Sequence, residues 1–203
     1  MNYLAHVFLS RDTPAAVTGA MLGDFVKGQV PEHWGPEVDA AIQLHRAIDR
    51  YTDQHPAVLA CRTLVSPTRR RFAGIMIDVF FDHFLARDWA RYHPQPLREF
   101  TQAIYAVLLP QRAVFPPRFQ RILPAMVRDD WLSAYRDLSA VNAALNGISR
   151  RFRYPERALA LRDAVVELER NYTSLGAYFG EFFPQLQAFV AAEARNARGV
   201  LST

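Results

Sequence analysis

Apolar residues recur every three or four positions along most of the chain, which is the spacing that gathers them on one face of an α-helix. The segment from Gly35 to Pro56 shows this with Val38, Ile42 and Ile48, and it carries a proline in its first turn. The alternation of apolar and polar residues that is typical of strands is not found. We predict helices over 2–10, 14–27, 35–56, 56–64, 66–92, 97–109, 117–129, 138–152 and 156–183.

Prolines and small polar residues set the expected ends of these helices. Ser66 is a suitable N-cap for the segment 66–92, with Pro67 in the first turn, and Ser139 is the expected N-cap of the helix within 138–152. Pro184 is expected to end or kink the last long helix. Because the segment 66–92 is long and strongly apolar in its middle, we predict that it forms the central helix of a bundle.

The 203 residues, half of them apolar, are sufficient for one all-α domain with a real core. We predict a single-domain helical bundle over residues 1–203, with a frayed tail from about 195. No apolar run reaches the length of a membrane span, and the N-terminus does not look like a signal peptide. Cys61 is the only cysteine, so no internal disulfide can form. These features favour a cytoplasmic protein that does not bind membranes.

The formal net charge is +4, and nearly all of the positive charge comes from arginine, because Lys27 is the only lysine. Guanidinium groups match the geometry of phosphate and carboxylate groups. A basic surface favours an acidic partner. The charge alone does not distinguish a nucleic acid, an acidic protein and a phosphorylated metabolite.

Charged residues interrupt the most apolar stretch of the chain, "IDVFFDHFLARDW" at 77–89. Asp78, Asp82 and His83 lie there among Phe, Val, Ile and Leu, and no Lys or Arg occurs from Ala73 to Ala86. An ionised carboxylate among buried apolar side chains is costly unless a positive group pairs with it. Two carboxylates and an imidazole together suggest that this positive group is a metal ion.

Three further groups of polar residues occur on predicted helices or at their ends. They are His6 in "NYLAHVFL", Asp24 in "MLGDFVKG", and His45, Asp49 and Asp53 in "LHRAIDRYTD". Residues four apart differ by only about 40° around a helix axis, so His45 and Asp49 share a face. The same spacing places Asp78 and Asp82 on one face, whereas His83 is rotated by about 100° from Asp82.

Imidazole and carboxylate ligands together suit divalent manganese, iron, zinc or magnesium. The absence of a cysteine cluster argues against a closed structural zinc site, and an open, oxygen-rich site is typical of Lewis-acid catalysis with an activated water. Structural roles remain open for several of these residues. His6 can be a core histidine, Asp24 can pair with Lys27, and Asp49 and Asp53 can pair with Arg46 and Arg50 on a solvated face.

Four motifs in this order, "MNYLAHVFLS", "GAMLGDFVKG", "LHRAIDRYTD" and "DVFFDHFLARDW", resemble the acyl-carrier-protein phosphodiesterase family. The similarity extends to "WLSAYRDLSAVNAALNGISRR". The resemblance implies a divergent HD-domain phosphohydrolase that depends on Mn²⁺, with Mg²⁺ as the alternative. It also implies removal of 4′-phosphopantetheine from the serine of holo-acyl carrier protein. The sequence departs from ordinary HD enzymes because its doublet is reversed, as Asp82-His83.

A metal-assisted hydrolysis assigns provisional roles to these residues. His83 is the candidate general acid or base, and Asp49 is expected to orient His45 or to bind the metal itself. Arg46 is the candidate for stabilising charge on the phosphate, with Arg69–Arg71 as alternatives. The candidate metal ligands are His6, Asp24, His45, Asp78 and Asp82.

An acidic carrier protein as substrate gives the arginines a function. The segments 68–72, 117–121 and 149–157 are candidate basic patches for this partner, although each can equally be an ordinary solvated helix end. We predict no nucleic-acid partner and no membrane partner. Two rival hypotheses are a phosphohydrolase acting on a nucleotide or another small phosphodiester, and a non-catalytic helical binding module.

Overall fold

The computed structural model describes residues 1–10, 12–152 and 154–200. Over these residues the chain forms eleven α-helices, several short 3-10 helices and no strand, which confirms the predicted all-α bundle. The likeness to HD domains stays a prediction. None of the helices in this described part combines the length and apolar character needed to cross a bilayer.

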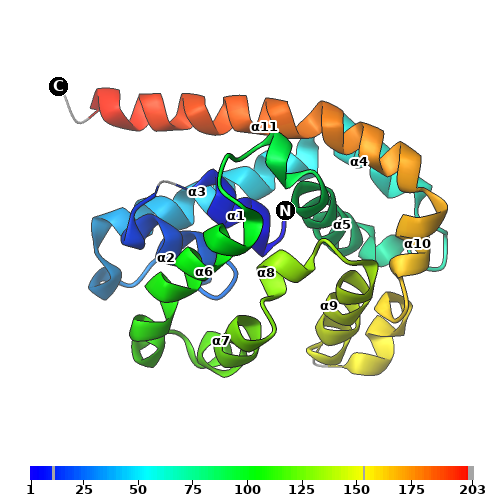
Figure 1. The fold of residues 1–203 in the computed structure, drawn as a ribbon, viewed down its shortest axis with the longest axis horizontal. Helices are drawn as coiled ribbons and strands as arrows, with labels where there is room; N and C mark the ends of the chain where they lie inside the picture. Colours follow the sequence, from blue (N-terminus) through cyan, green and yellow to red (C-terminus); the bar gives the residue numbers. More distant parts are fainter. Residues whose placement is uncertain (11, 153, 201–203) are drawn as a thin grey trace.

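The helices surround the start of the chain (Figure 1). Helix α11 lies along one edge of the molecule and packs on α3, α4 and α5, whereas α7, α8 and α9 lie on the opposite side. The α-helices are α1 (Tyr3–Leu9), α2 (Pro14–Leu22), α3 (Gly35–Gln54), α4 (Pro56–Leu64), α5 (Ala73–Arg87), α6 (Leu97–Leu108), α7 (Pro117–Arg128), α8 (Trp131–Ala134), α9 (Leu138–Arg150), α10 (Val165–Arg170) and α11 (Tyr172–Val200). The 3-10 helices are η1 (Glu32–Trp34), η2 (Arg70–Phe72), η3 (Trp89–Arg91), η4 (Leu109–Val114) and η5 (Pro155–Leu161).

Helix α5 is central, as its apolar sequence predicts. It packs against α1, α4, α9 and α11, and Phe80, Phe81 and Phe84 are fully buried. Each of these rings contributes roughly 2–3 kcal/mol by leaving water. The helix begins at Ala73 and not near Ser66, so the predicted N-cap is wrong. The hydroxyl of Ser66 instead donates to Glu167 Oε1 at 2.6 Å, and η2 lies between this contact and α5.

Helix α2 ends at Leu22 and not at 27, which frees the residues after it for a loop. Gly28 has φ +69°, in the left-handed region that favours glycine. Within α2, a β-carbon added to Gly19 would lie 2.4 Å from Ala41 Cβ and 2.6 Å from the Val38 carbonyl oxygen. Helices α2 and α3 therefore touch through backbone, and this close packing brings the loop after α2 beside the middle of α3.

The predicted helix 156–183 is wrong, because η5, α10 and α11 occupy this region. Asp163 interrupts it with φ +50°, and its carboxylate accepts from the side chains of Asn142 and Asn146 on α9. Pro184 lies inside α11 and does not end it. Helix α11 continues to Val200, and the rest of the expected frayed tail, 201–203, lies outside the described residues. Helix α9 begins at Leu138 with Asp137 as its N-cap, so Ser139 does not have the predicted capping role.

Candidate functional site

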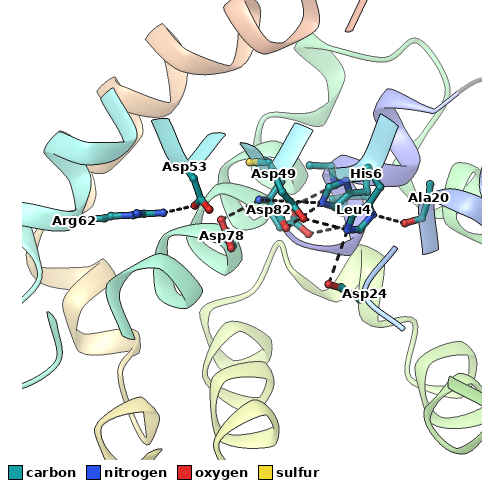
Figure 2. Close-up of polar contacts among 12 residues, drawn as sticks. Leu4, His6, Ala20, Asp24, Asp49, Asp53, Arg62, Asp78 and Asp82 are labelled. Carbon is teal, nitrogen blue, oxygen red and sulfur yellow. Dashed lines mark hydrogen bonds and ion pairs between the residues drawn. The ribbon is translucent and has the colours of Figure 1, made fainter. Parts of the chain in front are cut away.

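Two histidines and an aspartate from two helices meet near the centre of the molecule. His6 comes from α1, His45 and Asp49 come from α3, and one potential ligand atom of each lies within 4.8 Å of the other two. Asp49 bridges the histidines, with Oδ1 3.1 Å from His6 Nε2 and Oδ2 3.3 Å from His45 Nε2. The two imidazole rings stack at 3.5 Å between centroids. Two imidazoles thus present the same type of nitrogen to one carboxylate (Figure 2).

The backbone around α2 fixes the orientation of His45. Its Nδ1 lies 2.7 Å from the Ala20 carbonyl oxygen, which can only accept, so Nδ1 carries a proton and Nε2 is the nitrogen directed at the cluster. The other side of the ring rests on Gly23, where an added β-carbon would lie 2.2 Å from His45 Cγ. The sequence therefore needs a residue without a side chain at position 23.

We expect Gly23→Ala to disrupt the site while most of the fold remains. The added methyl group overlaps the ring of His45 and must displace it, and shifts in the groups that orient a ligand typically cost 10–100-fold in metal affinity. Metal content after dialysis and circular dichroism together check this result. Gly180→Ala is the matched control, because nothing lies within 4 Å of its added β-carbon. Equal metal affinity in the two variants would contradict the proposed packing constraint.

The surroundings of His6 and Asp49 shift the pKa values of both side chains. Burial and the neighbouring His45 lower the pKa of His6 to about 4, so its imidazole is neutral at pH 7. Burial alone would raise the pKa of Asp49, but hydrogen bonds from His45 and His6 outweigh it and hold this pKa well below its usual range. His6 Nδ1 is buried without a hydrogen-bond partner among the described residues. Two imidazoles and a carboxylate form a donor set suited to a divalent metal.

Asp24 and Asp78 lie at the border of this cluster. Asp24 Oδ1 is 3.9 Å from His45 Nε2. The Met1 ammonium donates to Asp78 Oδ1 at 2.9 Å and lies 3.6 Å from Asp49 Oδ1. Burial lowers the pKa of this amine, but Asp78 and Asp49 raise it to about 10, so it is charged at neutral pH. The carboxylate of Asp78 therefore has a positive partner, as its apolar surroundings require.

Asp82 has a different environment from the one that we predicted. It is fully buried, and its carboxylate accepts from the backbone N–H groups of Leu4 at 2.8 Å and Ala5 at 3.2 Å. These are first-turn donors of α1, whose N-cap residue Asn2 makes no side-chain cap bond. Burial raises the pKa of Asp82 to about 7, and the two N–H groups oppose this effect. Asp82 from α5 thus caps α1 and orients the helix that carries His6.

The predicted acid–base role of His83 has no geometric support. Its Nδ1–H donates to the Tyr135 carbonyl oxygen at 2.9 Å, and its Nε2 accepts from the Tyr172 hydroxyl at 2.8 Å. Both ring nitrogens are therefore engaged by groups outside the cluster. The rotation of about 100° from Asp82 along α5 explains this placement.

Arg46 also has a position that does not match its predicted role. Its guanidinium donates to the Val26 carbonyl oxygen at 3.0 Å and so holds the loop that follows Asp24. Among the alternatives, Arg69 donates to the carbonyl oxygens of Ala160 and Arg162. Neither arginine reaches the cluster. Arg46 is better described as a residue that positions the loop of Asp24.

Two cavities border the cluster. A cavity of about 650 Å³ is lined by Met1, Asp24 and Asp78 at one end, and we call it the α9 cavity because α9 forms one of its walls. A second cavity, of about 610 Å³, lies on the other side of Asp78 and contains Asp53 and residues of the segment 68–72. Asp53 pairs there with Arg62 of α4, and not with Arg46 or Arg50.

The family model for acyl carrier protein phosphodiesterase matches residues 1–186 of this chain. The chain belongs to this family. The phosphodiesterase of Serratia proteamaculans is 38% identical over 187 residues, covering 92% of this chain and 95% of that protein. The phosphodiesterase of Shigella boydii is 38% identical over 192 residues, covering 93% and 96%, and that of Salmonella agona is 36% identical over 198 residues, covering 96% and 100%. No solved structure matches the chain.

Each of the four motifs that resemble the acyl carrier protein phosphodiesterase family supplies a residue of the cluster, a neighbour of it, or the cap of the helix that carries His6. The first supplies His6, the second Asp24, the third His45 and Asp49, and the fourth the cap of α1. The sequence reasoning missed Gly23, the Ala20 carbonyl group and the Met1 amine. Gly23 directly precedes Asp24 in "LGDF", which is the one local signal for it; the other two are backbone groups that no side-chain pattern reveals.

Proposed function

We propose that this chain hydrolyses the phosphodiester that joins 4′-phosphopantetheine to a serine of holo-acyl carrier protein. A water oxygen would bond to phosphorus, the bond between phosphorus and the serine oxygen would break, and the serine would take up a proton. The products would be apo-acyl carrier protein and free 4′-phosphopantetheine. The main support is the His6–His45–Asp49 cluster beside an open cavity, in a chain whose curated relatives are named acyl carrier protein phosphodiesterases.

We propose a divalent metal, Mn²⁺ first and Mg²⁺ as the alternative, held by His6, His45 and Asp49. The chemistry of this donor set supports it, because one potential ligand atom from each of the three residues lies within 4.8 Å of the others and Asp49 is ionised. Asp24 and Asp78 add oxygen ligands at the border of the same cluster. A divalent cation at such a site polarises a phosphoryl oxygen and lowers the pKa of a bound water.

The protein groups would prepare the site for this reaction. The Ala20 carbonyl accepts from Nδ1 of His45, so Nε2 would be the nitrogen of this ring that binds a metal. Asp49 would supply negative charge between the two imidazoles and so offset the charge of a cation bound there. Asp24 is near the cluster and lines the α9 cavity, and 43% of its side chain is exposed. Its proposed role is to orient the attacking water.

Arginines support an acidic protein as the partner. Arg118, Arg150 and Arg151 are exposed and line the α9 cavity, so the predicted patches 117–121 and 149–157 converge although they are far apart in sequence. Positive charge around the opening would speed the approach of a strongly acidic carrier protein and orient it. Such carrier proteins occur in the cytoplasm, which is where we expect the reaction.

Mass spectrometry of holo-acyl carrier protein tests this function directly. Incubation with the enzyme and Mn²⁺ should convert the holo mass to the apo mass and release 4′-phosphopantetheine, and excess EDTA should prevent the conversion. Retention of the holo mass, together with Mn²⁺-dependent hydrolysis of bis(p-nitrophenyl) phosphate, would overturn the carrier-protein assignment in favour of a small-phosphodiester hydrolase. Inactivity toward both substrates would favour a non-catalytic binding module.

A further inference from the structure

We propose that the α9 cavity binds the pantetheine arm of the prosthetic group, an inference that rests on the proposed function. The cavity is lined by two direct neighbours of the cluster, because Asp24 Oδ1 lies 3.9 Å from His45 Nε2 and the Met1 amine lies 3.6 Å from Asp49 Oδ1. A phosphodiester held at the cluster would therefore have the cavity beside it. Its volume of about 650 Å³ lies in the range of roughly 300–1,000 Å³ that is common for small organic ligands. One ester oxygen of the phosphodiester would then point into the cavity, and the other toward the carrier protein outside.

The walls match a neutral, partly apolar chain. Phe25, Trp131 and Ile148 supply apolar surface, and α9 turns Ala143 and Ala144 toward the space. Pantetheine consists of a dimethyl-substituted carbon, a hydroxyl, two amides and a terminal thiol, and it carries no charge at neutral pH. An arm of this kind can lie next to the carboxylates of Asp24 and Asp78 without the repulsion that an anionic chain would meet.

The cavity lining also includes four cationic side chains, all exposed: Lys27, Arg118, Arg150 and Arg151. The guanidinium carbon of Arg118 lies 5.8 Å from the ring centroid of Phe25, and that of Arg151 lies 5.6 Å from the ring centroid of Trp131. Stacking on an aromatic ring restricts a long cationic side chain while its charge stays exposed. The exposed charges would therefore serve the phosphate and the acidic carrier protein, and the rings beneath them would contact the arm.

The second cavity fits this arm less well. Its lining includes Arg62, Arg70 and Arg71 together with Asp53, and it contains no aromatic residue. An uncharged arm would find few apolar contacts there, so the α9 cavity is the assignment that the wall chemistry favours.

Ala143→Leu tests the arm site without touching the cluster. Ala143 is exposed to the cavity, and leucine is nearly as good a helix former as alanine, so the change fills the space and preserves α9. The probe is free pantetheine, titrated against tryptophan fluorescence, with Trp131→Phe to assign the signal. We expect the dissociation constant to rise roughly tenfold or more. Ser139→Leu, on an exposed position of α9 outside the cavity lining, should bind pantetheine like the wild type.

Two further measurements separate this inference from the proposed function. Metal content and hydrolysis of bis(p-nitrophenyl) phosphate should stay within about twofold in Ala143→Leu, while kcat/KM for holo-acyl carrier protein falls roughly tenfold or more. Pantetheine binding that is equal in Ala143→Leu and the wild type would overturn the arm site even if holo-acyl carrier protein is hydrolysed. Failure of the wild type to hydrolyse holo-acyl carrier protein would overturn the proposed function, whereas the titration would still report on the cavity.

Discussion

Asp49→Asn should abolish metal binding and reduce kcat/KM for holo-acyl carrier protein by roughly a thousandfold or more. Among the described residues, Asp49 is the one carboxylate that contacts both histidines, and the amide that replaces it offers one oxygen and no charge. Charge stabilisation by a metal is worth several kcal/mol, and each 1.36 kcal/mol corresponds to a factor of ten in rate. Metal analysis of the purified protein and steady-state kinetics at saturating Mn²⁺ measure the two effects.

Asp53→Asn is the matched control, because it makes the same chemical change one turn further along α3. Asp53 pairs with Arg62 on the surface, and exposed pairs contribute about 0–1 kcal/mol. We expect this variant to keep its metal and to stay within about threefold of wild-type kcat/KM. Equal losses in both variants would show that negative charge near α3, and not the contact of Asp49 with both histidines, supports activity.

Local spacing pointed to side chains that the structure brings together, but it did not reveal the contacts between them. The i,i+4 relation of His45 and Asp49 placed them correctly on one face of α3, since this relation is a property of the helix itself. The central role of Asp49 depends on His6, which approaches from α1. No local pattern shows which of two carboxylates on neighbouring helices faces a distant histidine.

Asp82 illustrates the same limit for buried charge. Its apolar neighbours correctly indicated that a partner must exist, because an unpaired carboxylate there would be too costly. The partner is the first turn of another helix. Every residue except proline has a backbone N–H group, so the sequence does not show which of these groups will contact Asp82. The rotation between successive residues of a helix predicted that His83 lies on a different face from Asp82. The contacts of His83 with Tyr135 and Tyr172 agree with this prediction.

Prolines marked several helix starts correctly, but α5 does not begin beside Pro67 and α11 does not end at Pro184. Pro36 and Pro117 lie in the first turns of α3 and α7. The break at Asp163 depends on Asn142 and Asn146 of α9, and the late start of α5 accompanies the contact between Ser66 and Glu167. These contacts join residues far apart in sequence, so helix propensity cannot reveal them.

Asp82→Ala should lower the free energy of unfolding by about 2–4 kcal/mol. The substitution leaves two N–H groups of α1 without an acceptor; each buried unsatisfied donor costs about 1–3 kcal/mol, and loss of an N-cap costs roughly 0.5–2 kcal/mol. Urea denaturation of the metal-free protein measures this loss. Because α1 carries His6, weaker metal binding should accompany the loss as a consequence of a less ordered helix.

Asp82→Asn separates the capping role from the metal-ligand role that the sequence suggested. The amide oxygen can still accept from Leu4 or Ala5, so the loss of stability should be about half of that in Asp82→Ala. If Asp82 acts as the cap, the folded Asn variant should bind Mn²⁺ within about tenfold of the wild-type affinity, since its effect passes only through the orientation of α1. A variant with wild-type stability that binds no metal would instead make Asp82 a ligand, and α1 would then need another source of capping.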